Sequence, residues 1–263
     1  MADEVLYDVR DGVATLTLNR PDRLNAQNTA MFEMALGHLD RAATDDAVRV
    51  VVVTGAGRGF SAGGDLTQMA APSGEPEPFT ARVRGLRELT RTSQLLHEMP
   101  KVTIAAINGA CAGGGMSWAM ACDLRYAATS ARFTTAFVNA GLSGDFGMTW
   151  FLPRVAGSAR ARELLFFGDV LDAAQAAELG LVNAVVPDER LGDEVRERAA
   201  RLVAKAPLAL ARLKANLNDA DHLDLGPHLE IESERLIRTF DSADCAEAAH
   251  AFFERRAPRF QGR

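Results

Sequence analysis

The sequence predicts an α/β fold that is followed by a helical C-terminal region. Two apolar, β-branched runs at residues 48–54 and 102–107 have the composition of strands buried on both faces of a sheet. Each run leads into a glycine-rich segment, which is typical of a strand that ends in a turn. From Leu171 onward the pattern becomes mostly helical.

The N-terminal half is predicted to alternate between strands and helices. Residues 5–10 and 13–18 flank Asp11-Gly12, which is a two-residue signal for a β-hairpin. A proline-rich loop at residues 71–78 excludes both a helix and a central strand there. The other elements predicted in this half are a helix at 29–44, a strand at 48–54, a helix at 81–99, and strands at 102–107 and 123–128.

Beyond Leu171 the chain is predicted to form a series of helices. No internal repeat is evident, so these helices are not expected to form a repeat array. The predicted helices are 173–179, 191–204, 207–218, 227–239 and 243–256.

Composition and charge restrict the class of function. The chain has 263 residues, 48% hydrophobic and 24% charged, which suits one sizeable core of an ordinary globular protein. The net charge of −6 argues against a nucleic-acid surface. An anionic ligand would therefore need local positive groups.

The sequence predicts a cytoplasmic protein without a metal site or a membrane span. Residues 1–4 are acidic and do not begin a signal peptide. The three cysteines have no Cys-x-x-Cys spacing, so buried thiols in a reducing compartment are expected. The histidines lack a third metal ligand at useful spacing. Residues 102–122 carry no charge, but four glycines and Asn108 argue against a spanning helix.

Two glycine-rich segments carry the main functional signal. Residues 60–66 read Phe-Ser-Ala-Gly-Gly-Asp-Leu, and residues 108–116 read Asn-Gly-Ala-Cys-Ala-Gly-Gly-Gly-Met. Glycine lets a ligand approach a backbone N–H, and two converging N–H groups form an oxyanion hole. A helix-forming stretch follows Gly114, so an oxygen there would lie at the positive end of a helix. One such segment alone indicates an ordinary strand-to-helix turn, whereas the pair favours the oxyanion hole.

The order and spacing of these and other motifs resemble the crotonase family, also called the enoyl-CoA hydratase/isomerase family. The resemblance covers essentially the whole chain, and many independent motifs agree. It implies a spiral of ββα units at residues 1–195 and a helical oligomerisation region at residues 196–263. The matching segments are Asn19-Arg20-Pro21, Leu24-Asn25-Ala26, Val53-Thr54-Gly55, Ala62 to Asp65, Ala112 to Gly115, Leu152-Pro153-Arg154, residues 177–182 and residues 251–256.

The resemblance implies an acyl-CoA thioester substrate and a homotrimer or dimer of trimers. No separate cofactor is expected, because coenzyme A is part of the substrate, and no nucleic acid or membrane partner is expected either. The donors of the oxyanion hole are then the N–H groups of Gly64 and Gly114, which would stabilise a thioester enolate. The substrate and CoA path implied by the resemblance comprises Arg23, Leu24, Ala26, Ala62, Gly63, Asp65, Leu66, Ser117 and Phe137.

Several of these residues have competing interpretations. Arg23 is either a phosphate contact or an exposed loop arginine. Asp65 is expected to fix its turn through Asx-type hydrogen bonds. In this family the basic C-terminal end, here Arg255, Arg256 and Arg259, can lie near the CoA phosphates, and the competing interpretation is a solubilising helix terminus.

The chain departs from the hydratases that it resembles. Those enzymes place one glutamate three residues after the second oxyanion glycine and another in the segment after the following strand, and the pair activates water. Here the two positions hold Ser117 and Phe137, neither of which is a general acid or base at neutral pH. Direct addition of water is therefore not the expected reaction.

One carboxylate remains in a suggestive position, Asp145. Family members that shift double bonds, and the ring-epoxide isomerase of phenylacetyl-CoA breakdown, carry Asp or Glu at this point, and a dehalogenase branch uses an aspartate here as nucleophile. The competing interpretation is a turn or N-cap aspartate before residues 148–150. In an otherwise nonacidic pocket, Asp145 is expected to have a raised pKa and to take and return a proton.

The preferred interpretation is an acyl-CoA enzyme that acts as an isomerase-type proton shuttle with Asp145. The second is an enoyl-CoA hydratase of fatty-acid or aromatic-acid catabolism with relocated water-handling groups. The third is a non-catalytic acyl-CoA-binding or RNA-associated scaffold, since a protein can lose its acids and keep its fold.

Overall fold

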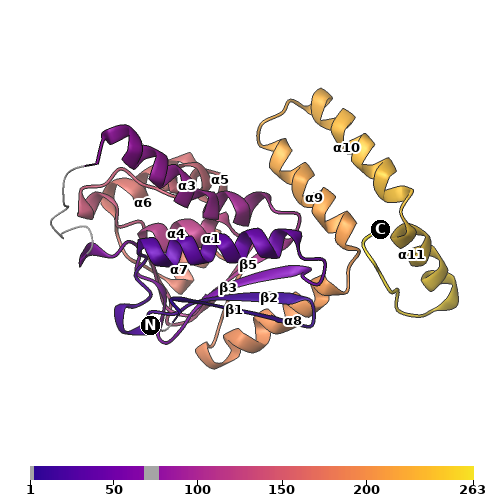
Figure 1. The fold of residues 1–263 in the computed structure, drawn as a ribbon, viewed down its shortest axis with the longest axis horizontal. Helices are drawn as coiled ribbons and strands as arrows, with labels where there is room; N and C mark the ends of the chain where they lie inside the picture. The colour runs from indigo at the N-terminus through magenta and orange to yellow at the C-terminus, as the bar shows by residue number, and fades with distance from the viewer. Residues whose placement is uncertain (1–2, 68–76) are drawn as a thin grey trace.

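Two β-sheets form the body of the molecule in the computed structural model, which describes residues 3–67 and 77–263 (Figure 1). The larger sheet has six strands in the order β1-β2-β3-β5-β7-β10, and the smaller has four in the order β4-β6-β8-β9. The strands are β1 Val5–Arg10, β2 Val13–Leu18, β3 Val50–Gly55, β4 Gly59–Ser61, β5 Val102–Ile107, β6 Ala110–Ala112, β7 Leu124–Ala128, β8 Arg132–Thr134, β9 Leu171–Asp172 and β10 Ala184–Val186.

A repeated ββα step connects the two sheets. In each of the pairs β3/β4, β5/β6 and β7/β8, the first strand joins the large sheet and the second joins the small one. Within the large sheet β3, β5 and β7 pair in parallel, and within the small sheet β4, β6 and β8 do the same, so the connections between them are crossovers. The predicted α/β class and the spiral of ββα units are therefore confirmed.

The hairpin between β1 and β2 forms where the sequence predicts it. All six residues of β1 pair antiparallel with β2. The two connecting residues have left-handed backbones, with φ of 49° at Asp11 and 79° at Gly12. Left-handed angles at both positions are those of a type I′ turn, whose twist matches that of the strands.

Strand β3 is buried on both faces, as its apolar run predicts. Val50 and Val52 pack in one hydrophobic cluster with α8 (Leu191–Val203), whereas Val51 and Val53 pack in the main core under α1 (Thr29–Thr44). Figure 1 shows these helices on opposite faces of the sheet. The strand begins two residues later than predicted because the Val48 N–H donates to the Asp45 carbonyl in a turn.

Most helices lie where the sequence predicts them, whereas two helices and several short strands were not anticipated. Helices α5 and α6 fill a stretch that carries no predicted element, and strands such as β4 and β6 are too short for a period-two pattern to show. The remaining α-helices are α3 Phe79–Glu98, α4 Gly113–Ala121, α5 Met148–Ala156, α6 Ser158–Phe167, α7 Ala173–Glu178, α9 Pro207–Ala220, α10 Leu225–Phe240 and α11 Ala243–Glu254.

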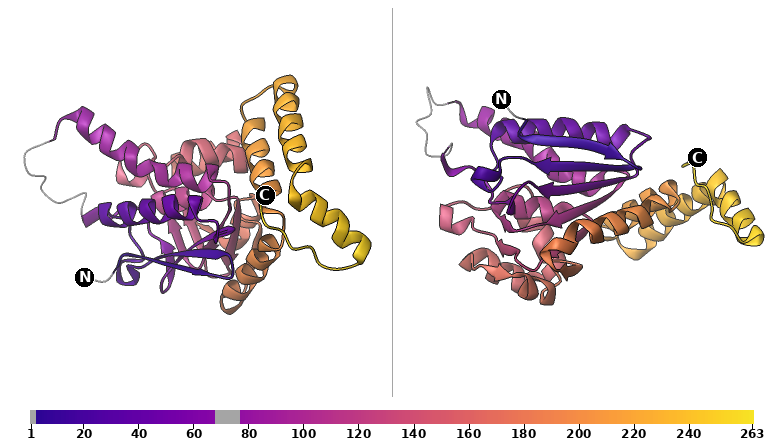
Figure 2. Two further views of the ribbon diagram at one scale, coloured as in Figure 1. Left: turned by 45° about the vertical axis from the view of Figure 1, so that its right-hand side comes forward. Right: turned by 90° about the horizontal axis from the view of Figure 1, so that it is seen from below.

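The C-terminal helices α9, α10 and α11 project from the body of the molecule (Figure 2). The boundary predicted after residue 195 falls inside α8, whose Leu191, Val195 and Ala199 pack on the large sheet. Whether residues 196–263 act as a separate oligomerisation region stays a prediction. Of the loop predicted at 71–78, residues 71–76 lie outside the described residues. No helix of the described part is long and apolar enough to cross a membrane.

Lys214 attaches α9 to the body. Its side chain is 6% exposed, and Nζ lies 2.8 Å from Oδ2 of Asp123. The same ammonium donates to the carbonyls of Leu96 and Lys101, each at 3.0 Å. Asp123, at the junction between α4 and β7, also accepts from the N–H of Thr103 at 2.7 Å. This buried ion pair therefore links α9 to α3 and β5.

We expect Lys214→Met to lower the free energy of unfolding by about 3–5 kcal/mol, because it leaves the Asp123 carboxylate without its buried cation. The double variant Lys214→Met/Asp123→Asn, which removes both charges, should recover at least half of that loss. Urea unfolding at one fixed protein concentration measures both values. A loss below about 1 kcal/mol in the single variant would show that the pair is only a surface interaction.

Candidate active site

The two glycine-rich segments lie in direct contact. Gly63 has φ of +87°, and a Cβ built on it would stand 2.9 Å from the Ala112 carbonyl oxygen and 3.3 Å from Cα of Gly113. Gly113 itself has φ of +47°. A side chain at Gly63 would separate the two backbones and strain its own. The close contact holds the next residue of each segment, Gly64 and Gly114, at one place.

Both Gly64 and Gly114 have N–H groups that are free to donate. Gln27 bridges the first segment in parallel fashion, with its N–H donating to the Gly63 carbonyl at 2.7 Å and its carbonyl accepting from the Asp65 N–H at 2.8 Å. In such pairing the Gly64 N–H faces the opposite side, and it has no partner among the described residues. Gly114 lies in the first turn of α4, where N–H groups have no intrahelical acceptor.

These donors border a cavity of about 950 Å³. Ten of the twelve residues in the predicted site line it, and Leu24 and Ser117 do not. The Leu24 side chain packs near Gly59, and the Ser117 hydroxyl lies beneath the cavity, where it donates to the carbonyls of Gly113 and Asp145. The lining residues are Arg23, Ala26, Ala62, Gly63, Gly64, Asp65, Leu66, Thr67, Gly113, Gly114, Ala136, Phe137, Asn139, Ala140, Leu142 and Asp145.

Six lining residues were not predicted from the sequence. Gly113 and Thr67 adjoin the glycine segments, and the rest come from the stretch that includes the 3₁₀ turn Val138–Ala140. The signal that could have found Asn139, Ala140 and Leu142 is their position between Phe137 and Asp145, since a chain that connects two site residues passes along the site, and Ala136 directly precedes Phe137. The four from this stretch are Ala136, Asn139, Ala140 and Leu142.

Asp145 reaches the cavity from a loop with left-handed backbone angles. Gly144, Phe146 and Gly147 all have positive φ, and Gly147 is the N-cap of α5. The competing interpretation is right about the turn, because the Asp145 carbonyl accepts from the Met148 N–H at 3.0 Å, and wrong about the N-cap, because the Asp145 side chain caps no helix. Its Oδ1 is buried and has no hydrogen-bond partner among the described residues. Burial raises the pKa of the Asp145 carboxyl to about 6.

Phe146 fixes the Asp145 loop to the core. It is 3% exposed and adopts φ of 47°, a conformation that is unfavourable for a bulky residue. Its ring stacks on Phe32 of α1 with centroids 4.6 Å apart and contacts the edge of Trp118 at 6.5 Å. The burial of this aromatic group offsets the backbone strain and positions the adjacent carboxyl.

Asp65 stabilises the turn that contains it, as the sequence predicts. Its Oδ1 accepts from both the N–H and the hydroxyl of Thr67, and its Oδ2 accepts from Arg20 at 2.8 Å. The Thr67 hydrogen bond, followed by the Arg20 interaction, lowers the pKa of Asp65 to about 2. Asp65 is therefore a permanently charged structural group, whereas Arg23 is an exposed cation at the rim of the cavity.

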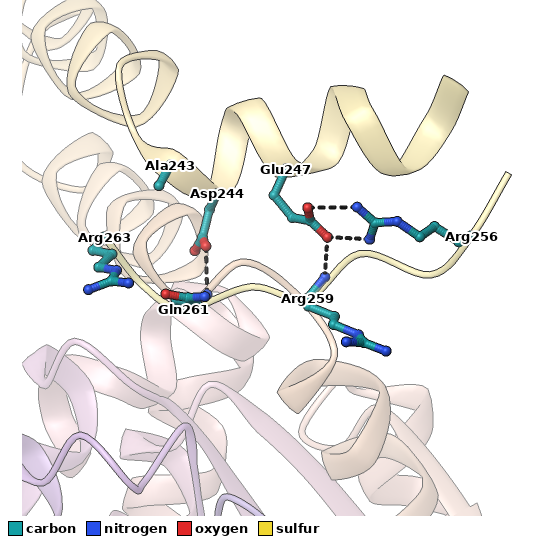
Figure 3. Close-up of a pocket in the computed structure, with 7 residues that line it drawn as sticks. All are labelled: Ala243, Asp244, Glu247, Arg256, Arg259, Gln261 and Arg263. Atoms are coloured by element: carbon teal, nitrogen blue, oxygen red, sulfur yellow. Dashed lines mark hydrogen bonds and ion pairs between the residues drawn. The ribbon is translucent and has the colours of Figure 1, made fainter. Parts of the chain in front are cut away.

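Of the basic C-terminal residues, Arg256 and Arg259 line a different pocket (Figure 3), and Arg255 is the C-cap of α11. Arg256 pairs with both carboxylate oxygens of Glu247, which also accepts from the backbone N–H of Arg259 at 2.7 Å. Asp244 accepts from the N–H of Gln261. These contacts hold the chain end against α11, which lies beyond α9 from the sheets (Figures 1 and 2). Within one chain, these arginines are remote from the cavity.

Fold and site together define an α/β protein with a preformed cavity, paired backbone donors and one carboxyl of raised pKa. The family model that matches the chain, "Enoyl-CoA hydratase/isomerase", spans residues 8–263. The chain is 39% identical over 265 residues to the 1,2-epoxyphenylacetyl-CoA isomerase of Escherichia coli, covering all of both chains. It is 34% identical to the crotonyl-CoA hydratase of Syntrophomonas wolfei, covering 98% of each.

Solved structures agree with this relationship. The crystal structure of an enoyl-CoA hydratase from Bacillus anthracis matches with a TM-score of 0.92 and 30% identity, over 99% of this chain and 100% of that one. The chain belongs to the enoyl-CoA hydratase/isomerase family.

We expect Asp145→Asn to raise the free energy of unfolding above pH 6, by about 1–3 kcal/mol. Burial raises the folded-state pKa from its ordinary 3.8 to about 6, so between these values the folded wild type binds more protons than the unfolded chain. Its stability therefore falls as pH rises through this range. The advantage of the variant should grow from pH 4 to pH 6 and then stay constant. Urea unfolding of both proteins across pH 4–8 measures it, and a pH-independent difference would contradict the raised pKa.

Proposed function

We propose that the chain is an acyl-CoA isomerase that moves a proton between two carbons of a thioester through Asp145. The observation that carries the proposal is the position of this carboxyl beside the free Gly64 and Gly114 donors. Among the described lining residues, the other ionisable groups are Arg23 and the ion-paired Asp65. Asp145 alone among them has a pKa near the range that proton transfer requires.

The chemistry follows from the two functions of the site. The thioester carbonyl oxygen accepts hydrogen bonds from the Gly64 and Gly114 N–H groups. The Asp145 carboxylate removes a proton from the α-carbon, and the electron pair of the broken C–H bond delocalises into the carbonyl as an enolate, conjugated with the neighbouring double bond. The neutral carboxyl then returns the proton to the γ-carbon, and the double bond moves by one position. The oxyanion donors stabilise the enolate most strongly in the transition state.

The side chains around the acyl group also support isomerisation over hydration. Ser117 is buried beneath the cavity, and its hydroxyl is engaged with two carbonyls. Phe137 contributes an apolar wall. Asp65, the other carboxylate among the described lining residues, is paired with Arg20, so Asp145 must both accept and donate the proton. The resemblance to a relative named as an isomerase supports the same assignment.

Enoyl-CoA hydration is the second candidate, because several relatives are named hydratases. It requires water to be activated near the β-carbon by Asp145 alone. For either reaction we propose that no separate cofactor is needed, because coenzyme A enters with the substrate. The buried thiols Cys111 and Cys122 support the proposal of a reducing, cytoplasmic location.

We also propose that the chain assembles as a homotrimer or a dimer of trimers. The projecting C-terminal helices expose large apolar side chains that a single chain leaves uncovered, which is the composition of an interface. They are Leu213, Leu217, Leu225, Leu229, Leu236, Ile237, Phe240, Phe252 and Phe253.

Asp145→Asn is expected to lower kcat for a 3-enoyl-CoA by about 10²–10⁴, because it removes the base while preserving shape. The affinity for acyl-CoA, measured by calorimetry, should change less than about threefold, since the free glycine donors are untouched. Deuterium exchange at the α- and γ-carbons, followed by NMR, measures the proton transfer directly. Undiminished exchange in the variant would show that Asp145 has only a structural role.

Hydration of crotonyl-CoA is expected to be slow in the wild type, with kcat/KM below the usual efficient range of about 10⁴–10⁸ M⁻¹s⁻¹. The reason is the absence of an acid at Ser117 and Phe137. Absorbance at the enoyl-thioester band measures the rate, with isomerisation of a 3-enoyl-CoA by the same preparation as the control. Hydration faster than isomerisation would favour the hydratase instead.

A further inference from the structure

Gln27 is a buried polar side chain that the proposed mechanism leaves unused. It is 2% exposed, and neither Oε1 nor Nε2 has a hydrogen-bond partner within residues 3–67 and 77–263. Buried carboxamides are ordinarily hydrogen-bonded, because an unpaired one destabilises the fold. An unpaired amide in this position therefore indicates a partner that it contacts in another state of the protein.

The Gln27 amide lies between the two glycine segments. Its backbone is fixed to the first segment by the hydrogen bonds to Gly63 and Asp65. Its Oε1 lies 2.5 Å from the point where a Cβ on Gly114 would stand. The side chain therefore occupies the space that glycine leaves open at the second donor, and any larger residue at position 114 would displace it.

The Asp145 carboxyl lies near the same Cβ position of Gly114. Its Oδ1 is 3.6 Å from the Cβ position of Gly114, and this oxygen is also buried and unpaired. A carboxamide suits this carboxyl in both protonation states, because Oδ1 can accept from Nε2 whether or not Oδ2 carries a proton. The raised pKa of Asp145 has burial as its cause, with no contribution from a charged neighbour. The two unpaired groups are therefore chemically complementary.

We propose that Gln27 is the positioning residue of Asp145, with its carboxamide hydrogen-bonded to Oδ1 during turnover so that Oδ2 faces the substrate carbon. This inference rests on the proposed function of Asp145. The proton that leaves the substrate carbon passes to Oδ2 and returns to the second carbon, and Gln27 neither gains nor loses a proton. Oδ1 remains an acceptor when Oδ2 carries the proton, so the Nε2 donor serves both protonation states without rotation and binds the carboxylate more strongly.

The test replaces Gln27 with methionine, which keeps the length of the side chain and removes its hydrogen-bonding groups. Loss of a donor to the carboxylate raises the pKa of the carboxyl, so the ¹³C titration midpoint of Asp145, measured with a saturated acyl-CoA bound as a non-reacting ligand, should move up by about one pH unit. The signal is assigned by its absence in Asp145→Asn. The acid limb of kcat, which reports the substrate-bound enzyme, should move by the same amount, and kcat should fall about tenfold while KM stays within about threefold.

Gln94→Met is the matched control, because it makes the same change at an exposed glutamine of α3 and should alter none of these values. An unchanged midpoint in Gln27→Met overturns the proposal, even where kcat falls, because a structural defect alone lowers kcat without moving that pKa. If Asp145→Asn keeps full activity, the proposed function fails, and the titration midpoint still decides whether Gln27 contacts Asp145.

A measurement on the wild type covers the case in which Gln27→Met does not fold. In the same complex with a saturated acyl-CoA, one side-chain ¹⁵N signal of a glutamine should titrate with the midpoint of Asp145, and that titration should vanish in Asp145→Asn. The absence of any such signal overturns the proposal.

Discussion

The contact between the two glycine segments is the constraint on which the site depends. It forms because β4 and β6 pair in parallel in the small sheet, which brings the residues that follow each strand to the same edge. The Ala112 carbonyl then lies so close to Gly63 that a methyl group would not fit. Backbone donors fixed in this way need no reorganisation when charge develops on a bound carbonyl, which is the condition under which they stabilise a transition state most.

The sequence predicted the fold well where a long periodic pattern exists and poorly where it does not. The bounds of β1, β2, β5 and α1 agree with the prediction, because alternation, a continuous apolar run or amphipathic spacing extends over at least six residues in each. The strands of the small sheet have two or three residues, so their pairing is determined by the neighbouring segment and not by local pattern. Their positions follow only once the ββα spiral is known.

The same distinction applies to the candidate site. Glycine segments and a carboxylate between glycines are visible in a sequence, and ten of the twelve residues predicted there line one cavity. Whether Ser117 faces the cavity depends on the rotation of α4, and it is turned toward the Asp145 loop instead. Gln27 could not be identified from the sequence, because a glutamine in a loop is common. Only the structure shows that its amide is buried without a hydrogen-bond partner among the described residues.

The energetics of Asp145 connect stability to chemistry. Burial raises the pKa of the Asp145 carboxyl to about 6. The carboxylate therefore destabilises the folded state at neutral pH, because the folded chain must keep a partly desolvated anion. The aromatic contacts of Phe146 with Phe32 and Trp118 keep that loop in place despite its left-handed backbone. An amide able to pair with either protonation state lessens the cost of the anion without removing its basicity. A cationic partner would instead lower the pKa and weaken the base, which is a physical reason for a neutral residue such as Gln27 at this point.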